Sequence, residues 1–260
     1  MSAEIYSSGE IRRGLATSVI GRRVLFYPRL ASTMDTARQE AKSGASEGTV
    51  IIAGEQTRGR GRLKRPWLSP VGNIALSIIL RPDIAGLPCL MMISSLAAVR
   101  SIREVAGLKA RIKWPNDVLI GGKKAGGILI ENEVKGDRVA YAVIGIGINV
   151  RLRTADHADI AGIAAGLNET AGREISRAEL VRSLLEEFER LYLALPDGQT
   201  IYEEWRDNLA TLGKKVTATS GKDVMEGIAV SVDGNGALVL RRPDGTMTRV
   251  VAGDVTLREG

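Results

Sequence analysis

Short apolar runs, partly β-branched and bounded by Gly or Pro, recur along the first 150 residues of the chain. They occupy residues 49–53, 73–80, 110–114, 127–131 and 140–148. Runs of this length with such boundaries are typical of strands rather than helices. Because they follow one another closely along the chain, the pattern predicts one mixed, mainly antiparallel sheet.

Helical patterns separate and follow these runs. The S-x-x-D sequence at Ser32 predicts a helix over residues 32–41. Residues 87–106 are apolar on all sides and end at Gly107, which predicts a buried helix with a glycine cap. A capping box at residues 176–179 predicts another helix start, and residues 202–209 form a further candidate.

The pattern changes after Leu212, where short alternating stretches are separated by turn sequences. Asp-Gly-Asn-Gly at residues 233–236 and Asp244-Gly245 are typical hairpin or tight turns. A β module this small is only marginally stable alone, so we expect it to pack on the main domain. The sequence therefore predicts an α+β protein with two domains, residues 1–211 and 212–260.

Composition narrows the chemistry. The 260 residues carry 36 Lys and Arg against 30 Asp and Glu, and contain one cysteine, Cys89, and one histidine, His157. This leaves no disulfide, no thiolate metal cage and no two-histidine zinc site. We find no signal peptide and no apolar segment long enough to cross a bilayer, so we expect a cytoplasmic protein with no membrane partner.

The segment Thr57–Trp67 places five cations and two glycines immediately after a predicted strand. Glycine lets backbone N–H groups approach an anion, and arginine offers a planar charged fork for carboxylate or phosphate. The spacing matches neither a Walker A loop nor a dinucleotide-binding turn. Composition alone leaves two interpretations open, a small anionic ligand or RNA.

Two further segments carry polar residues or glycines at predicted strand ends. Pro115 ends a strand and leaves Asn116 and Asp117 at its end, and residues 121–124, Gly-Gly-Lys-Lys, predict a hairpin that delivers a lysine to the next strand. Such groups beside an arginine loop suit a metal-bound nucleotide and an anionic reactant. The glycines of residues 145–149 indicate either room for another group or close strand packing.

Together these segments resemble the biotin protein ligase family. The resemblance runs in order from Ser32-Thr33 through residues 55–67, 113–117, 124–129 and 145–149 to the β module. It implies a catalytic domain with a class II synthetase-like fold and an SH3-like C-terminal domain. It also implies a two-step reaction, in which biotin and MgATP give biotinyl-5′-AMP and the biotin then passes to a carrier lysine.

The resemblance also assigns residues to roles. It implies biotin binding by Ser32, Thr33, Met34, Gln56, Arg60, Gly61, Arg62, Lys124 and Gly127. It implies nucleotide binding by Arg60, Arg62, Asn116, Asp117, Lys124 and Asn149, and catalysis by Arg62, Lys124 and Asp117. Magnesium is expected to be held mainly by ATP. Asp117 is left with three possible roles, toward metal, nucleotide or acceptor lysine, and Met34 departs from the family's usual polar residue.

The expected partner is the biotin carboxyl carrier protein or domain of a biotin-dependent carboxylase, and the ligase is expected to be a monomer or a homodimer. About thirty residues precede Ser32, too few for a winged helix-turn-helix domain, so we expect Met1–Arg23 to form a short helix or arm and no specific DNA binding. Lipoate protein ligase is the nearest alternative. A basic nucleic-acid-binding module is a more distant one, with only ten aromatic residues to stack on bases.

Overall fold

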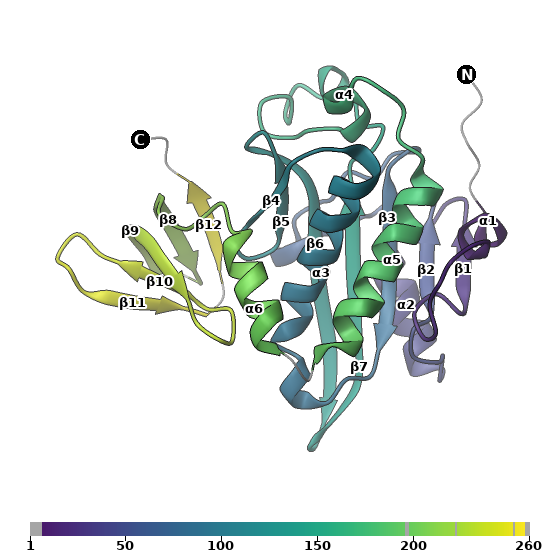
Figure 1. Ribbon diagram of the computed structural model, residues 1–260, viewed down its shortest axis with the longest axis horizontal. Helices are drawn as coiled ribbons and strands as arrows, with labels where there is room; N and C mark the ends of the chain where they lie inside the picture. The colour runs from purple at the N-terminus through teal and green to yellow at the C-terminus, as the bar shows by residue number, and fades with distance from the viewer. Residues whose placement is uncertain (1–6, 196–197, 222, 252, 258–260) are drawn as a thin grey trace.

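The computed structural model describes residues 7–195, 198–221, 223–251 and 253–257. A seven-stranded sheet forms the centre of the larger part of the chain (Figure 1). Its strands are β1 (Val24–Tyr27), β2 (Val50–Ala53), β3 (Ile74–Leu80), β4 (Ala110–Lys113), β5 (Asp117–Ile120), β6 (Lys123–Lys135) and β7 (Arg138–Ile148).

The strand order is β1-β2-β3-β7-β6-β5-β4, and every pair except β1–β2 is antiparallel. The prediction of a mainly antiparallel sheet is confirmed. Strands β1 and β5 were not predicted. β5 begins with the acidic Asp117 directly after the turn at residues 114–116, which leaves an apolar run of only three residues. Asp117 is the first residue of β5 and follows directly on the turn after β4.

Helices cover both faces of this sheet. They are α1 (Ser8–Arg12), α2 (Thr33–Lys42), α3 (Cys89–Ser101), α4 (Leu167–Ala171), α5 (Arg177–Leu193) and α6 (Gly198–Asp207). Four single turns accompany them, η1 (Arg62–Lys64), η2 (Ile84–Gly86), η3 (Ile102–Ala106) and η4 (Thr154–Asp156). In Figure 1, α3 and α5 cross one face of the sheet while α2 lies behind it.

The predicted helices are present with small changes. Ser32 is the N-cap of α2, but its side chain makes no capping hydrogen bond. Ser176 does cap α5, accepting a hydrogen bond from the Glu179 amide. Gly107, at φ +69°, ends the η3 turn that extends α3. Within the expected N-terminal arm, α1 is the helix, and residues 1–6 lie outside the described residues.

The second domain is a five-stranded antiparallel sheet with the order β11-β10-β9-β8-β12. Its strands are β8 (Lys215–Ser220), β9 (Asp223–Val232), β10 (Leu238–Arg241), β11 (Met247–Val250) and β12 (Asp254–Leu257). Indole Nε1 of Trp114 donates to the Gly236 carbonyl at 2.8 Å, and the Tyr202 hydroxyl donates to that of Val232 at 2.6 Å. These bonds tie the small sheet to the large sheet and to α6, so its face toward the main domain is fixed.

Period-two alternation divides the side chains of the large sheet between two cores. Ile74, Leu76 and Ile78 of β3 point into the main core under α3 and α5. On the opposite face, Ile79 and Val143 pack with Met34 of α2. Because the next positions along β3 and β7 on this second face are small, a hollow remains between α2 and the second domain.

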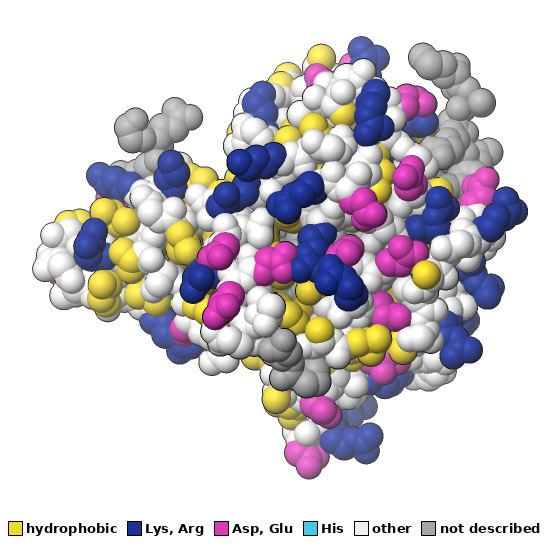
Figure 2. All heavy atoms as spheres, viewed as in Figure 1, with side chains coloured by type: hydrophobic (Ala, Val, Ile, Leu, Met, Phe, Trp, Pro, Cys, Tyr) yellow, Lys and Arg dark blue, Asp and Glu magenta, His cyan; other side chains and the backbone are white. Residues whose placement is uncertain are grey.

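Among the described residues, no helix is long and apolar enough to span a membrane. In the face shown by Figure 2, Lys and Arg side chains are interspersed with Asp and Glu. This mixed distribution gives no continuous basic stripe on that face.

Candidate active site

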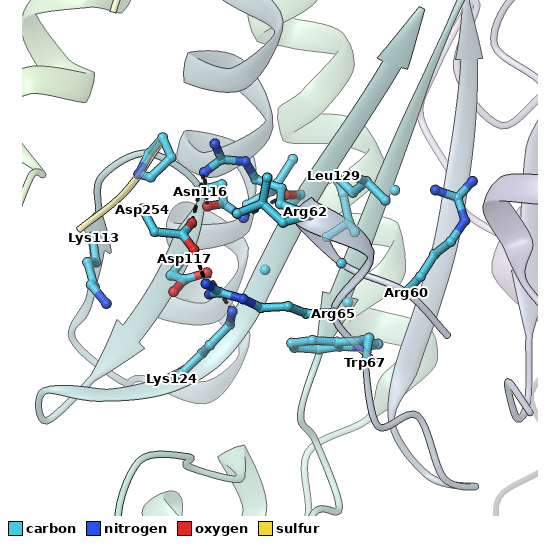
Figure 3. Close-up of a pocket in the computed structure, with 18 of the residues that line it drawn as sticks. Arg60, Arg62, Arg65, Trp67, Lys113, Asn116, Asp117, Lys124, Leu129 and Asp254 are labelled. Atoms are coloured by element: carbon cyan, nitrogen blue, oxygen red, sulfur yellow. Dashed lines mark hydrogen bonds and ion pairs between the residues drawn. The ribbon is translucent and has the colours of Figure 1, made fainter. Parts of the chain in front are cut away.

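The hollow is a cavity of about 550 Å³, lined by residues of both domains (Figure 3). Its walls come from α2, the segment 56–67, the β5–β6 hairpin and the ends of β8 and β12. A volume of this size suits a small organic ligand. The cavity contains most of the residues that the sequence singled out.

The floor of the cavity consists of two rows of residues that cross β3, β7 and β6. Ala75 pairs with Gly147, which pairs with Gly127, and Ser77 pairs with Gly145 in the neighbouring row. A Cβ atom on Gly147 would lie 2.6 Å from Nε1 of Trp67, and one on Gly145 would lie 2.5 Å from Sδ of Met34.

The glycines of β7 had two interpretations, room for another group or close strand packing, and these contacts favour the first. The room that they provide is filled by two of the protein's own side chains, the indole of Trp67 and the thioether of Met34. Both side chains line the cavity. Met34, which stands where a polar residue was expected, therefore gives the cavity an apolar, polarisable wall at this point.

A chain of hydrogen bonds forms the uncharged end of the cavity. The Ser77 hydroxyl donates to Thr33 Oγ1 at 2.9 Å, and both the Thr33 amide and hydroxyl donate to Gln56 Oε1, at 2.8 and 3.0 Å. The side-chain carbonyl of Gln56 thus accepts two hydrogen bonds, and its NH₂ group remains available as a donor. Ser32, at 2% exposure, has a buried hydroxyl with no hydrogen-bond partner among the described residues.

The arginine-rich segment folds as a tight hairpin over the cavity. Trp67 N–H donates to the Gly59 carbonyl at 2.9 Å, and Gly61 N–H donates to that of Arg65 at 2.8 Å. A Cβ on Gly59 would lie 2.4 Å from the Trp67 carbonyl oxygen, which explains the requirement for glycine there. At the tip, Leu63 and Lys64 have positive φ angles of 53° and 59°.

The arginines of this hairpin point in different directions. Arg60 turns away from the other cations of the cavity (Figure 3). It pairs with Glu131 and Asp35. Its hydrogen bond to Glu131, followed by the one to Asp35, raises the pKa of Arg60 despite burial. Arg62 turns inward, and its Nη1 donates to Asn116 Oδ1 at 3.0 Å.

The Arg62 side chain is only 21% exposed. Burial lowers the pKa of its guanidinium, with Asp254 and Asp117 acting in the opposite direction. Asn116 in turn donates from Nδ2 to the Ile128 carbonyl at 2.9 Å, so the amide is fixed on both sides. Arginine stays charged at physiological pH, and these hydrogen bonds give the Arg62 guanidinium a defined orientation toward the cavity.

The β5–β6 hairpin delivers Lys124 as predicted, through Gly121 and Gly122 with φ of +56° and +80°. Lys124 and Gly127 are three positions apart, so in a regular strand they would face opposite sides. The pairing shifts register at Ala125, and this bulge brings the Lys124 side chain to the cavity face. Its Nζ lies 2.6 Å from Asp117 Oδ1 and 5.4 Å from the centroid of a Trp67 ring.

The electrostatic character of the cavity is cationic. Among the described residues that line it, five are Arg or Lys (Arg60, Arg62, Arg65, Lys113 and Lys124) and two are acidic (Asp117 and Asp254). Within the described part of the chain, no cluster of three or more His, Cys, Asp or Glu could hold a metal ion. The charged end of the cavity is thus suited to an anionic ligand.

The cavity brings together most of the predicted site residues: Thr33, Met34, Gln56, Arg60, Gly61, Arg62, Asn116, Asp117, Lys124 and Gly127. Ser32 and Asn149 are absent from its lining. Asn149 is 5% exposed, and its side chain donates to the Lys124 carbonyl at 3.3 Å, so it supports the backbone of that lysine.

Among the cavity residues that sequence reasoning missed, Trp67, Arg65 and Asp254 bear most on its chemistry. An isolated tryptophan such as Trp67 is more often a core or rim residue, yet here it covers the glycine floor. Arg65 lines the cavity, and Asp254 enters it from the second domain. The cation cluster at residues 58–65 was a signal for Arg65, whereas nothing local marks Asp254.

Known protein families match both parts of the chain. The biotin/lipoate A/B protein ligase family model matches residues 26–149, and the biotin protein ligase C-terminal domain model matches residues 211–258. The described residues that line the cavity lie within these two segments.

Individual proteins agree with these matches. The bifunctional ligase/repressor BirA of Bacillus subtilis is 39% identical, over 96% of this chain and 79% of that protein. The biotin–[acetyl-CoA-carboxylase] ligase of Paracoccus denitrificans is 33% identical, over 83% of this chain and 94% of that one. The biotin protein ligase of Aquifex aeolicus in complex with biotin and ATP superposes with a TM-score of 0.79 at 26% identity, covering 92% and 100% of the two chains. This chain belongs to the biotin protein ligase family.

Proposed function

We propose that this chain is an ATP-dependent biotin protein ligase that uses biotin and MgATP. The biotin carboxylate attacks the α-phosphorus of ATP, giving biotinyl-5′-AMP and releasing pyrophosphate. The amine of a carrier lysine then attacks the acyl carbon, forms an amide with loss of a proton, and releases AMP. Magnesium enters and leaves with the nucleotide as part of the substrate.

One observation carries this proposal. A single cavity of about 550 Å³ joins an uncharged hydrogen-bonding end to a cationic end, and the floor between them is glycine and alanine covered by Trp67. Biotin has the matching form, with a neutral ureido ring at one end and a carboxylate at the other. The adenylate places its phosphate next to that carboxylate, at the cationic end.

At the uncharged end, the polar groups have spare capacity for a ureido group. Gln56 accepts from Thr33 and so presents its NH₂ group as a donor. The buried Ser32 hydroxyl is unpaired among the described residues, which supports its assignment although Ser32 is not one of the lining residues. Because a ureido carbonyl accepts and its N–H groups donate, we assign recognition of the ring to this group.

At the cationic end, Arg62 and Lys124 reduce the repulsion between the carboxylate and the triphosphate. They also stabilise the charge that develops on the phosphorus during the displacement, which is the largest contribution in such reactions. The two cations come from opposite walls, the hairpin 59–67 and β6, so a ligand between them is clamped. We assign catalysis to these two residues.

Asp117 lies against Lys124, and this favours one of its three possible roles. With Oδ1 2.6 Å from Lys124 Nζ, the carboxylate holds the ammonium group toward the cavity. We therefore assign Asp117 to positioning Lys124 rather than to deprotonating the acceptor lysine.

The acceptor and the setting of the reaction follow from the proposed activity. We propose a biotin carboxyl carrier domain as the acceptor, the cytoplasm as the location, and a domain division into residues 1–211 and 212–260. A monomer or homodimer without specific DNA binding is part of the same proposal. The Paracoccus denitrificans relative, whose name specifies acetyl-CoA carboxylase, supports a carboxylase acceptor.

The test is pyrophosphate release by the purified protein with MgATP and either biotin or lipoate. Hydroxylamine is present to trap the acyl-adenylate as the hydroxamate, which also releases AMP. Release that requires biotin, with formation of the biotin hydroxamate, is the expected result. Release with lipoate alone would instead assign the lipoate ligase activity, and no release from the folded protein with either acid would refute both.

A further inference from the structure

Asp254 is the point at which the second domain reaches into the arginine hairpin. It is the first residue of β12 and pairs with Thr219 of β8. The preceding Gly253 has φ +149°, and a Cβ there would lie 2.2 Å from the Thr219 carbonyl oxygen. This glycine lets β12 approach β8 closely, and the small sheet thereby fixes the position of the Asp254 carboxylate.

The carboxylate contacts two arginines of the hairpin. Oδ2 lies 2.5 Å from Nη2 of Arg65, and Oδ1 lies 3.7 Å from Nη1 of Arg62 (Figure 3). The two arginines flank Leu63 and Lys64, the only non-glycine residues with positive φ among those described. One carboxylate therefore spans the tip of the hairpin and connects its two sides.

The contact places the Asp254 carboxylate beside the arginines that the proposed reaction needs for the phosphates of the nucleotide. Arg62 faces Asn116 and Lys124 across the charged end of the cavity, where the nucleotide phosphates are proposed to bind. A guanidinium that is shared with a carboxylate has fewer donors for a phosphate. Asp254 and an incoming phosphate thus compete for the same two arginines.

We propose that Asp254 is a positioning residue of the second domain that holds Arg62 and Arg65 over the cavity in the ligand-free protein and releases them to the nucleotide phosphates. This inference rests on the proposed function for the identity of the ligand. The contact itself stands on the two ion pairs and is testable without any substrate.

The experiment compares Asp254→Asn with the wild-type protein in two assays. Trypsin cleavage after Arg62 and Lys64, without ligand, should be at least about threefold faster in the variant, because partly exposed ion pairs shift an opening equilibrium by about this factor. Binding of inorganic pyrophosphate, measured by calorimetry at low ionic strength, should tighten about threefold to tenfold, because the competing charge is gone.

Two further variants show whether the effect depends on this charge at this place. Asp254→Glu, which keeps the carboxylate, should restore slow cleavage and weaker pyrophosphate binding. Asp137→Asn removes the same charge from the exposed β6–β7 turn and should leave both assays at the wild-type value. If the effect came from net charge alone, Asp137→Asn would change both assays as much as Asp254→Asn does. That result would overturn the proposal.

Unchanged cleavage of Asp254→Asn would show that the carboxylate does not hold the hairpin, which overturns the proposal. Pyrophosphate binding that is unchanged or weaker would equally overturn it, because Asp254 would then not compete. Failure of the proposed function is measured separately, as absence of biotin-dependent pyrophosphate release by the wild-type protein. The cleavage assay contains no substrate, so it tests the Asp254 contact whether or not the proposed function is correct.

Discussion

Lys124→Met separates the catalytic role of this lysine from its structural role. Methionine retains an unbranched apolar stem of similar length, so the packing of that stem beside Gly127 and Trp67 is preserved. What is lost is the ammonium charge 2.6 Å from Asp117. The substitution therefore removes one ion pair and one cation of the cavity.

The structure gives different magnitudes for the two losses. The Lys124 side chain is 37% exposed, so solvent screens the pair and its removal should cost about 1 kcal/mol of stability or less. Loss of a preorganised charge at the reacting phosphate should slow the chemical step about 100-fold to 1,000-fold, or about 3 to 4 kcal/mol. The rate should thus fall far more than the stability.

The assay is biotin-dependent pyrophosphate release at saturating MgATP, with thermal unfolding measured on the same sample. We expect the melting temperature to fall by about 2 to 4 °C, as about 1 kcal/mol implies for a protein of this size. Lys123→Met is the matched control, since Lys123 is the exposed neighbour in β6, and its rate should stay within about twofold of the wild type. A cooperatively folded Lys124→Met protein that retains about a third or more of the wild-type rate would refute the assignment.

Three further predictions concern the cavity floor and the N-terminal segment. Gly147→Ala should slow pyrophosphate release at least about tenfold, because its Cβ would lie 2.6 Å from Trp67 Nε1 and the indole must leave the floor; tryptophan fluorescence should report that shift. Glu189→Gln should lower the free energy of unfolding in urea by about 2 to 3 kcal/mol, because the carboxylate accepts from the amides of residues 18–20 and an amide cannot replace both oxygens. Burial alone would raise the pKa of Glu189, but these hydrogen bonds outweigh it and hold the pKa below its usual range. The stability that Glu189 contributes is therefore complete above its unfolded-state pKa and lost as the pH falls through its lower folded-state pKa, so on acidification below about pH 4 the wild type should lose more stability than Glu189→Gln.

The controls come from other positions of the same residue types. Gly162 has open space where a Cβ would lie and no positive φ, so Gly162→Ala should leave the rate unchanged. Glu186 also lies on α5 and accepts a single exposed hydrogen bond from the Ala16 amide, so Glu186→Gln should cost less than about 1 kcal/mol. Equal losses at Glu186 and Glu189, or parallel acid curves for the wild type and Glu189→Gln, would contradict the account of this carboxylate.

Local sequence determined much of the architecture because its signals act over a few residues. Short apolar runs bounded by Gly or Pro predicted the main strands, the glycines at 121 and 122 predicted the hairpin carrying Lys124, and Gly107 marked the end of the extended helix. These signals work because turn and cap positions with positive φ favour glycine whatever surrounds them. The family resemblance added the roles of residues that no local pattern could assign.

Only the tertiary structure decided how these pieces combine. The bulge at Ala125 returns Lys124 to the face of Gly127, and a shift of one residue cannot be read from composition. The space beside Gly147 is filled by Trp67, eighty residues earlier in the chain. Asp254 meets Arg65 across the two domains. Contacts between residues so distant in sequence depend on strand order and domain packing, and these are set by burial of the whole core rather than by any single segment.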